Sequence, residues 1–312
     1  MNLAPVILFV YNRPWHTEQT LEALMLNELA DQSTLYIYCD GPKDHASDES
    51  LKNIKEVRTV IRKKNWCKEV IIRERTKNFG LAESVIKGVS DVIEKHGRVI
   101  VLEDDIVTGK YFLKFMNDGL NIYENEPQVF GVSGYKFPSI KEVKEPTYFL
   151  PISSSWSYAT WSDRWNKVNF NGNLLLKKID ENKLNEKLDF GGYPFYSMLK
   201  DQIKGKNDSW AVRFYASMLL DGAYFLFPQM SLIENIGFDN SGTHCGTDDY
   251  FSNVKISNEK IKVNKKNVKL NNRIVLNFRK SFKLRYYKKK RYKKIRIKNI
   301  LKGLFVKVFQ NH

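Results

Sequence analysis

The sequence predicts an α/β domain with a mostly parallel central sheet, followed by a basic C-terminal helical tail. Short apolar runs alternate with stretches of helical periodicity from residue 5 to residue 102. Such alternation produces a parallel sheet with helices on both faces. Hydrophobic residues make up 42% of the 312 residues, which is enough for the packed core of one large domain. The positive charge gathers at the carboxyl end, where a separate extension is expected.

Four apolar runs in the first hundred residues are predicted to be strands. They are short and rich in β-branched and aromatic residues, as buried parallel strands are. They are PVILFVY at 5–11, STLYIYC at 33–39, KEVIIRER at 68–75 and RVIVL at 98–102. Helices are predicted between them, from Thr17 onward, over 49–64 and over 81–95, because apolar residues recur there every three or four positions.

The remaining sequence is less regular. Helical spacing recurs over 110–123, 194–204 and 210–220, and a strand is expected near VFGVSGYKFP at 129–138. The stretch YFLFPQMSLIENIGFDNSGTHCG at 224–246 is expected to give a strand followed by a polar, glycine-rich loop. The three cysteines, Cys39, Cys67 and Cys245, are far apart and form no zinc-type cluster. The start, MNLAPVILFVYNRP, lacks a basic region and has an apolar run too short for a signal peptide or a spanning helix. A reducing, cytoplasmic location is therefore expected.

Polar side chains follow each of the four predicted strands. Arg13 follows the first, Asp40 the second and Asn78 the third, while Glu103-Asp104-Asp105 ends the fourth. Ligands of open α/β sheets bind at the carboxyl ends of the strands. These side chains are therefore expected to line one edge of the sheet.

The three adjacent acids of GRVIVLEDDIVTGKYF repel one another unless a cation compensates them. Mg2+ and Mn2+ prefer oxygen ligands and are often held by one or two carboxylates together with substrate phosphates. If the strand continued through the acids, Glu103 and Asp105 would lie on one side and Asp104 on the other. The alternative is that Asp104 or Asp105 only caps the following helix.

The segment VIVLEDDIVTGKYFLKFMNDGL resembles the metal-binding region of GT-A glycosyltransferases, and among them the N-acetylglucosaminyltransferase I type, whose Glu-Asp-Asp is a variant of the DXD motif. The resemblance covers roughly residues 4–250 and is strongest at 99–116. It implies a Rossmann-like GT-A fold, a nucleotide-sugar donor, a UDP-sugar in the first place, and Mn2+ or Mg2+ as cofactor. It also implies transfer to a hydroxyl with inversion.

The resemblance assigns a role to each polar residue at the strand ends. Asp105 would hold the metal, Asp104 would lie against the ribose and Glu103 against the donor sugar. Arg13 would meet the nucleotide or its diphosphate, Asp40 the uracil or ribose, and Asn78 the donor side of the loop before the next helix. From the residues alone, Arg13, Asp40 and Asn78 are equally compatible with turn or surface roles.

Inverting transfer needs a general base near the acceptor, and the resemblance points to Asp208 in GKNDSWAVRFYASMLL. The family has an acidic pair there, whereas Asn207 precedes Asp208 in this chain. The alternative is that Asp208 or Ser209 caps the helix, and Asp201 and Asp163 are rival bases.

Two further segments are compared with the family. His244, in the glycine-rich GFDNSGTHCG, would be a second metal ligand, although a lone histidine is also compatible with a structural role. The stretch SSSWSYATW at 153–161 would flank the donor sugar and the acceptor, or would simply be an aromatic core segment.

The tail is predicted to begin near residue 250, which divides the chain into 1–250 and 251–312. The second part holds 21 Lys+Arg against Glu259, or +20, so the first part of this +16 chain carries −4. Apolar residues from Ile297 to Val308 fall on one helical face among lysines. Such a helix suits an anionic membrane surface, which would place the protein on the inner face of the cell membrane. The alternatives are docking on the domain, or nucleic acid, for which no recognised module is present.

The sequence therefore predicts a metal-dependent glycosyltransferase acting on a glycan or lipid-linked acceptor, as in surface polysaccharide or lipopolysaccharide synthesis. Two alternatives remain. A sugar-phosphate nucleotidyltransferase shares the sheet type but is disfavoured, because no glycine- and basic-rich nucleotide loop lies near the amino end. The other is a non-enzymatic adaptor that binds a membrane or nucleic acid through its basic tail.

Overall fold

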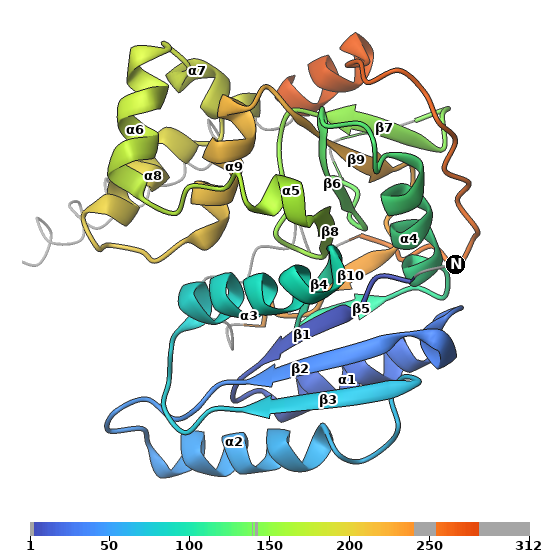
Figure 1. The fold of residues 1–312 in the computed structure, drawn as a ribbon, viewed down its shortest axis with the longest axis vertical. Helices are drawn as coiled ribbons and strands as arrows, with labels where there is room; N and C mark the ends of the chain where they lie inside the picture. The colour runs from blue at the N-terminus through green and yellow to red at the C-terminus, as the bar shows by residue number, and fades with distance from the viewer. Residues whose placement is uncertain (1–2, 139, 141–142, 240–253, 281–312) are drawn as a thin grey trace, which may run out of the picture.

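An eight-stranded sheet runs through the computed structural model, which describes residues 3–138, 140, 143–239 and 254–280 (Figure 1). The strand order is β3-β2-β1-β4-β8-β6-β9-β7. A separate ribbon pairs two short strands, β5 and β10. The strands are β1 (Val6–Val10), β2 (Thr34–Cys39), β3 (Glu69–Glu74), β4 (Arg98–Glu103), β5 (Ile106–Thr108), β6 (Val129–Ser133), β7 (Thr147–Leu150), β8 (Tyr158–Trp161), β9 (Tyr224–Pro228) and β10 (Ile233–Asn235).

The four strands expected in the first hundred residues are the parallel part of this sheet. β1 lies between β2 and β4, and β3 pairs with β2, all in parallel. β8 then runs antiparallel to both β4 and β6, β9 is parallel to β6, and β7 is antiparallel to β9. The α/β fold is confirmed, and the sheet is a mixed one whose parallel strands bring their carboxyl ends to one edge.

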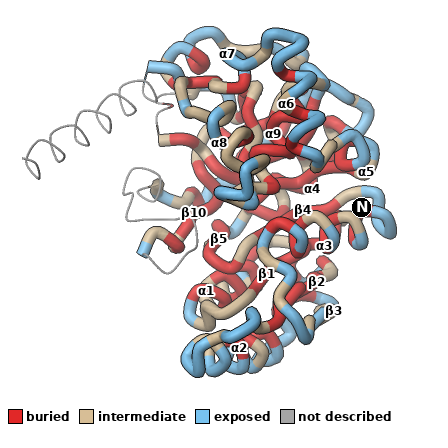
Figure 2. Tube along the Cα trace, turned by 90° about the vertical axis from the view of Figure 1, so that its left-hand side faces the viewer, coloured by how far each residue is buried: buried red, intermediate tan, exposed pale blue. Residues whose placement is uncertain are grey.

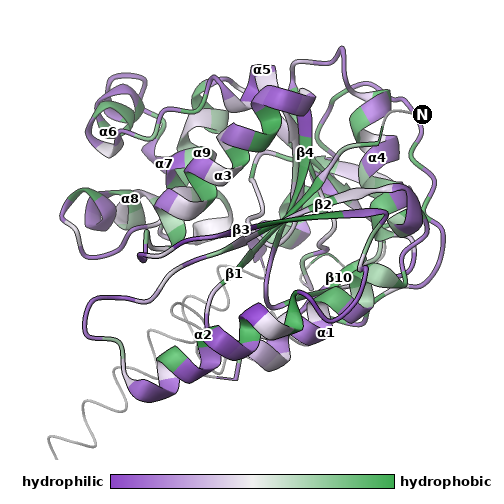
Figure 3. Cartoon of the chain, turned by 60° about the horizontal axis from the view of Figure 1, so that its bottom comes forward, coloured by the Kyte–Doolittle hydropathy of each residue, from purple (hydrophilic) through white to green (hydrophobic). Residues whose placement is uncertain are grey.

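Helices cover both faces of the parallel strands, with α1 (Pro14–Met25) and α2 (Asp48–Val60) on one side and α3 (Leu81–His96) on the other (Figure 3). α3 buries Val85, Val89 and Val92 at helical spacing. It ends at Gly97, whose φ of 73° lies in the left-handed region that glycine adopts without strain. Behind these helices, β1, β2 and β4 are mostly buried and β3 at the edge of the sheet is partly exposed, while α2 keeps an exposed outer surface (Figure 2).

The second half of the chain adds a group of helices beside the antiparallel strands (Figure 1). α6 packs on α8 and α9, and α7 packs on α8 and α9 as well. The helices are α4 (Phe112–Ile122), α5 (Ser162–Trp165), α6 (Gly172–Glu181), α7 (Asn185–Leu188), α8 (Phe195–Ile203) and α9 (Trp210–Leu220), with 3-10 turns η1 (Ala30–Gln32) and η2 (Phe190–Gly192).

The first part of the basic extension packs on the main domain. Residues 272–280 are helical, and the fully buried ring of Phe278 lies 5.0 Å from that of Phe137 and 5.1 Å from that of Phe190. Upstream, the Tyr123 hydroxyl donates to the carbonyl of Asn264 at 3.0 Å. The division near residue 250 stays a prediction, and the amphipathic segment from 297 to 308 lies outside the described residues. Among the residues that are described, no helix has the length and apolar character needed to cross a membrane.

Candidate active site

Arg13 binds two of the three acids at the end of β4. Its Nε lies 3.3 Å from Asp104 Oδ2, and its Nη2 contacts Asp104 Oδ1 and lies 3.0 Å from Asp105 Oδ2. Asp104 and Asp105 are only 5% and 4% exposed. The loop after β1 and the turn after β4 are brought together because β1 and β4 are parallel neighbours. The expected meeting of strand ends is therefore present for these three residues.

Only Glu103, the last residue of β4, lies in the strand, whereas Asp104 and Asp105 lie in the turn after it and both face Arg13. The strand does not continue through the acids, so the condition for the expected alternation is not met. The helix-cap alternative is wrong, because α4 begins at Phe112 with Tyr111 at its N-cap. Short strand β5 separates the acids from that helix.

Burial raises the pKa of two of the acids, Glu103 and Asp104, and the charges of neighbouring carboxylates add to the shift. The pKa of the half-buried Glu103 is raised to about 8 by burial, then by the charges of Asp105 and Asp104, although Arg13 opposes this. Burial also raises the pKa of Asp104 against the opposing charge of Arg13. Burial lowers the pKa of Arg13, but the two aspartates outweigh it and leave that pKa above its ordinary value. Arg13 thus opposes the upward pKa shifts of Glu103 and Asp104 without removing them.

The segment after β10 covers the acids, a feature that the sequence reasoning missed. Ile236 donates its backbone N–H to the carbonyl of Asp105 at 2.9 Å. A Cβ on Gly237 would stand 2.2 Å from Asp105 Oδ2, so only glycine lets the backbone approach this closely. Farther along, Asp239 Oδ2 lies 3.0 Å from His16 Nε2 in α1. The one sequence signal was the glycine directly behind a short apolar run.

Two buried atoms in the cluster indicate a missing ligand. Within the described residues, Asp105 Oδ1 and Arg13 Nη1 are buried without a hydrogen bond, an arrangement that native proteins usually avoid. A carboxylate oxygen beside a guanidinium fits a divalent cation and its phosphate partner. No group of three His, Cys, Asp or Glu suited to a metal occurs in the described part of the chain. His244 lies outside the described residues.

Asp40 and Asn78 form a second group, which shapes the loop before α3. The Asp40 carboxylate accepts from the N–H groups of Gly41, Phe79 and Gly80 at 3.0 to 3.1 Å. Asn78 donates to the carbonyl of Gly41 at 2.9 Å. In the described structure their hydrogen bonds go to this loop rather than to Asp104 or Asp105. The turn-forming alternative is therefore realised, and contact with a nucleotide stays a prediction.

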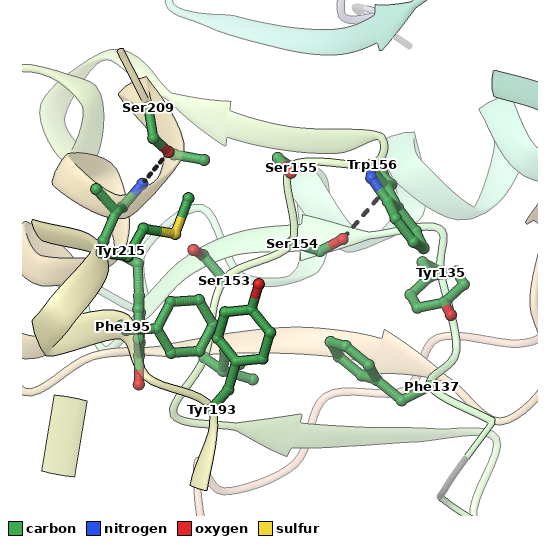
Figure 4. A pocket seen from close by; sticks show the side chains of 14 residues that line it. Tyr135, Phe137, Ser153, Ser154, Ser155, Trp156, Tyr193, Phe195, Ser209 and Tyr215 are labelled. Atoms are coloured by element: carbon green, nitrogen blue, oxygen red, sulfur yellow. Dashed lines mark hydrogen bonds between the residues drawn. The ribbon is translucent and has the colours of Figure 1, made fainter. Parts of the chain in front are cut away.

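A cavity of about 220 Å³ (Figure 4) is linked to the acid cluster through one aromatic contact, although none of Arg13, Glu103, Asp104 and Asp105 lines it. The link is Phe238, which follows the covering Gly237 and whose ring lies 5.4 Å from the ring of Trp156 in the cavity wall. Ser209 lies in the same wall. Fourteen residues line the cavity: Tyr135, Phe137, Ile152, Ser153, Ser154, Ser155, Trp156, Tyr193, Phe195, Met198, Ser209, Ala211, Val212 and Tyr215.

Asp208 directly precedes Ser209 in the sequence and is not itself among the residues that line the cavity. Its side chain is 69% exposed and pairs with Arg213 Nη2 at 3.1 Å. Ser209, not Asp208, caps α9 by accepting from the N–H of Val212 at 3.2 Å. The rivals Asp163 and Asp201 pair with Arg164 and Lys206 and are absent from the cavity wall. Asp208 is thus the candidate adjacent to the wall in sequence.

Comparisons with known proteins give no match to any family model and no match among curated proteins. Solved structures with partial similarity include S. aureus TarS, at 11% identity and TM-score 0.36 over 74% of this chain and 36% of that one. A second is mannosyltransferase PcManGT from Pyrobaculum calidifontis in complex with GDP-Man and Mn2+. It has 12% sequence identity and a TM-score of 0.37, over 70% of this chain and 74% of that one. A third is a UDP-glucose pyrophosphorylase complexed with UDP-glucose, with 10% sequence identity and a TM-score of 0.35 over 73% of this chain and 91% of that one. Similarity at this level identifies neither the family nor the reaction of the chain.

Proposed function

We propose that the protein is a metal-dependent, inverting glycosyltransferase of the GT-A type, resembling N-acetylglucosaminyltransferase I. It transfers a sugar from a nucleotide sugar, a UDP-sugar in the first place, to a hydroxyl of a glycan or lipid-linked acceptor. The observation that carries the proposal is the buried cluster of Arg13, Asp104 and Asp105. Two of its polar atoms have no partner in the described structure, and it is linked to a cavity with room for a second substrate.

The donor is assigned to the acid cluster. Arg13 directs its guanidinium at the diphosphate, whose oxygens match the donor fork. Asp105 would hold Mn2+ or Mg2+, with His244 as a second ligand, and the bound ion would neutralise the charge on the leaving diphosphate. Asp104 would bind the ribose, Glu103 the donor sugar, and Asp40 and Asn78 the base side of the nucleotide.

The acceptor is assigned to the side of Asp208. Its carboxylate takes the proton of the acceptor hydroxyl as general base. The hydroxyl oxygen forms a bond to the anomeric carbon while the bond from that carbon to the diphosphate oxygen breaks. The electron pair of that bond leaves with the nucleoside diphosphate. Attack from the face opposite the leaving group inverts the anomeric centre.

Substitution of the proposed metal ligand tests the assignment. We expect Asp105→Ala to lower UDP-sugar turnover with Mn2+ by on the order of 100-fold or more, because the leaving diphosphate loses its counter-charge. Free UDP in the medium is the readout. Asp118→Asn is the control, since Asp118 forms only a surface pair with Lys114 in α4.

Turnover that survives Asp105→Ala would contradict the mechanism. Release of pyrophosphate in place of UDP would instead identify a sugar-phosphate nucleotidyltransferase. A nucleotide-sugar screen by thermal shift, with and without Mn2+, selects the donor, because a bound ligand stabilises the fold by mass action.

The proposed setting is the synthesis of surface polysaccharide or lipopolysaccharide on the cytoplasmic face of the membrane. The supporting feature is the basic extension, whose 21 Lys+Arg against one acid would attract anionic lipid. A lipid-linked acceptor would then be present at the surface where the enzyme is held.

A further inference from the structure

We infer that the cavity linked to the acid cluster binds one uncharged pyranose ring of the acceptor. The inference rests on the proposed function and names the chemical class of its second substrate. None of the fourteen residues that line the cavity carries a charge. Their polar groups are the hydroxyls of four serines and three tyrosines and the indole N–H of Trp156.

Among the described residues of the wall, no cation is present to pair with an acidic sugar. A carboxylate or phosphate moved from water into this wall would lose its hydration without meeting a cation, at a cost of several kcal/mol. Arg213, a cation close to Ser209, already pairs with Asp208 and also donates to the carbonyl of Phe170. The wall therefore favours a neutral ligand.

The size and the two kinds of wall indicate a sugar ring. Drug-sized ligands occupy pockets of about 300 to 1,000 Å³, so a cavity of about 220 Å³ suits a single ring. Figure 4 shows aromatic rings around the cavity, with Phe195 and Tyr193 near Ser153, and with Trp156 and Tyr135 on the side of Ser154. A pyranose has a face of C–H groups that stacks on aromatic rings and a rim of hydroxyls.

The serine loop explains why a lipid chain is a poorer occupant. Within the described residues, the hydroxyls of Ser153 and Ser155 make no hydrogen bond, while that of Ser154 is turned to the carbonyl of Trp156 at 3.4 Å. An acyl or prenyl chain would cover Ser153 and Ser155 and leave them unpaired, which costs about 1 to 3 kcal/mol for each buried group. Sugar hydroxyls would pair with them.

The position of the cavity is consistent with an acceptor site for the proposed sugar transfer. Trp156 joins it through Phe238 to the segment that covers Asp105. Ser209 also lines the cavity, and Asp208 directly precedes it in the sequence. A ring held here has the proposed donor on one side and the proposed base on the other.

The test is ligand-observed NMR by saturation transfer on the full chain, with four probes. Two are neutral, methyl glucoside and methyl N-acetylglucosaminide, and two are charged, methyl glucuronide and glucose 6-phosphate. We expect signal from a neutral probe and at least fivefold less from the charged ones. Tyr193→Ala should lower the neutral signal at least fivefold, whereas Tyr193→Phe should keep most of it, because the ring remains.

Tyr196→Ala is the matched control, because Tyr196 lies three residues away and bonds Asp180 at 2.7 Å without lining the cavity. If Tyr193→Ala does not fold, the double variant Ser153→Ala with Ser155→Ala serves in its place and should also weaken the neutral probes. Equal or stronger binding of a charged probe, no neutral signal in the full chain, or displacement of the sugar by a prenyl alcohol would overturn the inference.

A separate measurement keeps the two proposals apart. The thermal shift caused by UDP with Mn2+ reports on the acid cluster and should be unchanged by Tyr193→Ala. Loss of that shift in the unmodified chain would count against the glycosyltransferase proposal, whereas a retained shift without sugar binding would count only against the acceptor assignment.

Discussion

At the scale of single residues, Asp105 is held from two directions. Its carbonyl accepts from Ile236, and its carboxylate lies between Arg13 and Gly237. Asp105 could be predicted as a site residue because it follows an apolar run of β-forming residues in the sequence. Gly237 could not, because the contact depends on pairing between β5 and β10, more than a hundred residues apart. Local patterns report strand ends well, but they do not report which distant backbone covers them.

Gly237→Ala should destabilise the fold by about 1 to 3 kcal/mol, because the added Cβ would overlap the Asp105 carboxylate. Urea unfolding measures this cost. The same substitution in the Asp105→Ala background provides the control, since the carboxylate is then gone and the cost should shrink. Equal costs in both backgrounds would show that the contact with Asp105 is not the cause.

At the scale of elements, predictability followed the length and burial of each segment. β1, β2 and β4 are apolar and buried along nearly their whole length, so their patterns were plain. β7 was missed because it has only four residues and lies between Pro146 and Pro151. α6 was missed because its polar surface dominates, with only Gly172, Leu175 and Ile179 buried. β5 and β10 have three residues each, too few for a periodic signal.

The helix over 272–280 offers a test of how firmly the basic extension is anchored. Phe278→Ala should cost about 3 to 5 kcal/mol, because a fully buried ring between Phe137 and Phe190 is replaced by a cavity. Leu276→Ala is the control from the same helix, since Leu276 is 54% exposed. Its change should stay within about 0.5 kcal/mol. Similar unfolding midpoints for the two variants would mean that this helix does not stabilise the domain.

At the scale of the whole molecule, charge is separated along the chain. Residues 281–312 contain 12 Lys+Arg and no acid, so their removal lowers the net charge from +16 to +4. The remaining extension up to residue 280 contributes Ile274, Val275 and Phe278 to the core. Shortening the chain at residue 280 therefore keeps Ile274, Val275 and Phe278 in place in the sequence.

A chain ending at residue 280 should lose binding to vesicles that contain phosphatidylserine. Each basic residue near such a surface contributes about 1 kcal/mol, so removal of even five should weaken partitioning more than a thousandfold. Sedimentation with vesicles at 50 and 200 mM salt measures this, and the full chain should bind less at the higher salt. The UDP and Mn2+ thermal shift should persist in the shortened chain. Unchanged vesicle binding after shortening would place the membrane contact elsewhere.

The β5–β10 ribbon also bears on the order in which the protein becomes competent during synthesis. Residues 106–108 leave the ribosome long before their partners at 233–235 exist. A nascent chain that stops short of residue 233 has its three acids but neither the ribbon nor the Gly237 backbone that lies over Asp105. The acids therefore stay uncovered from their synthesis until residue 237 has been added, when about three quarters of the chain has been made.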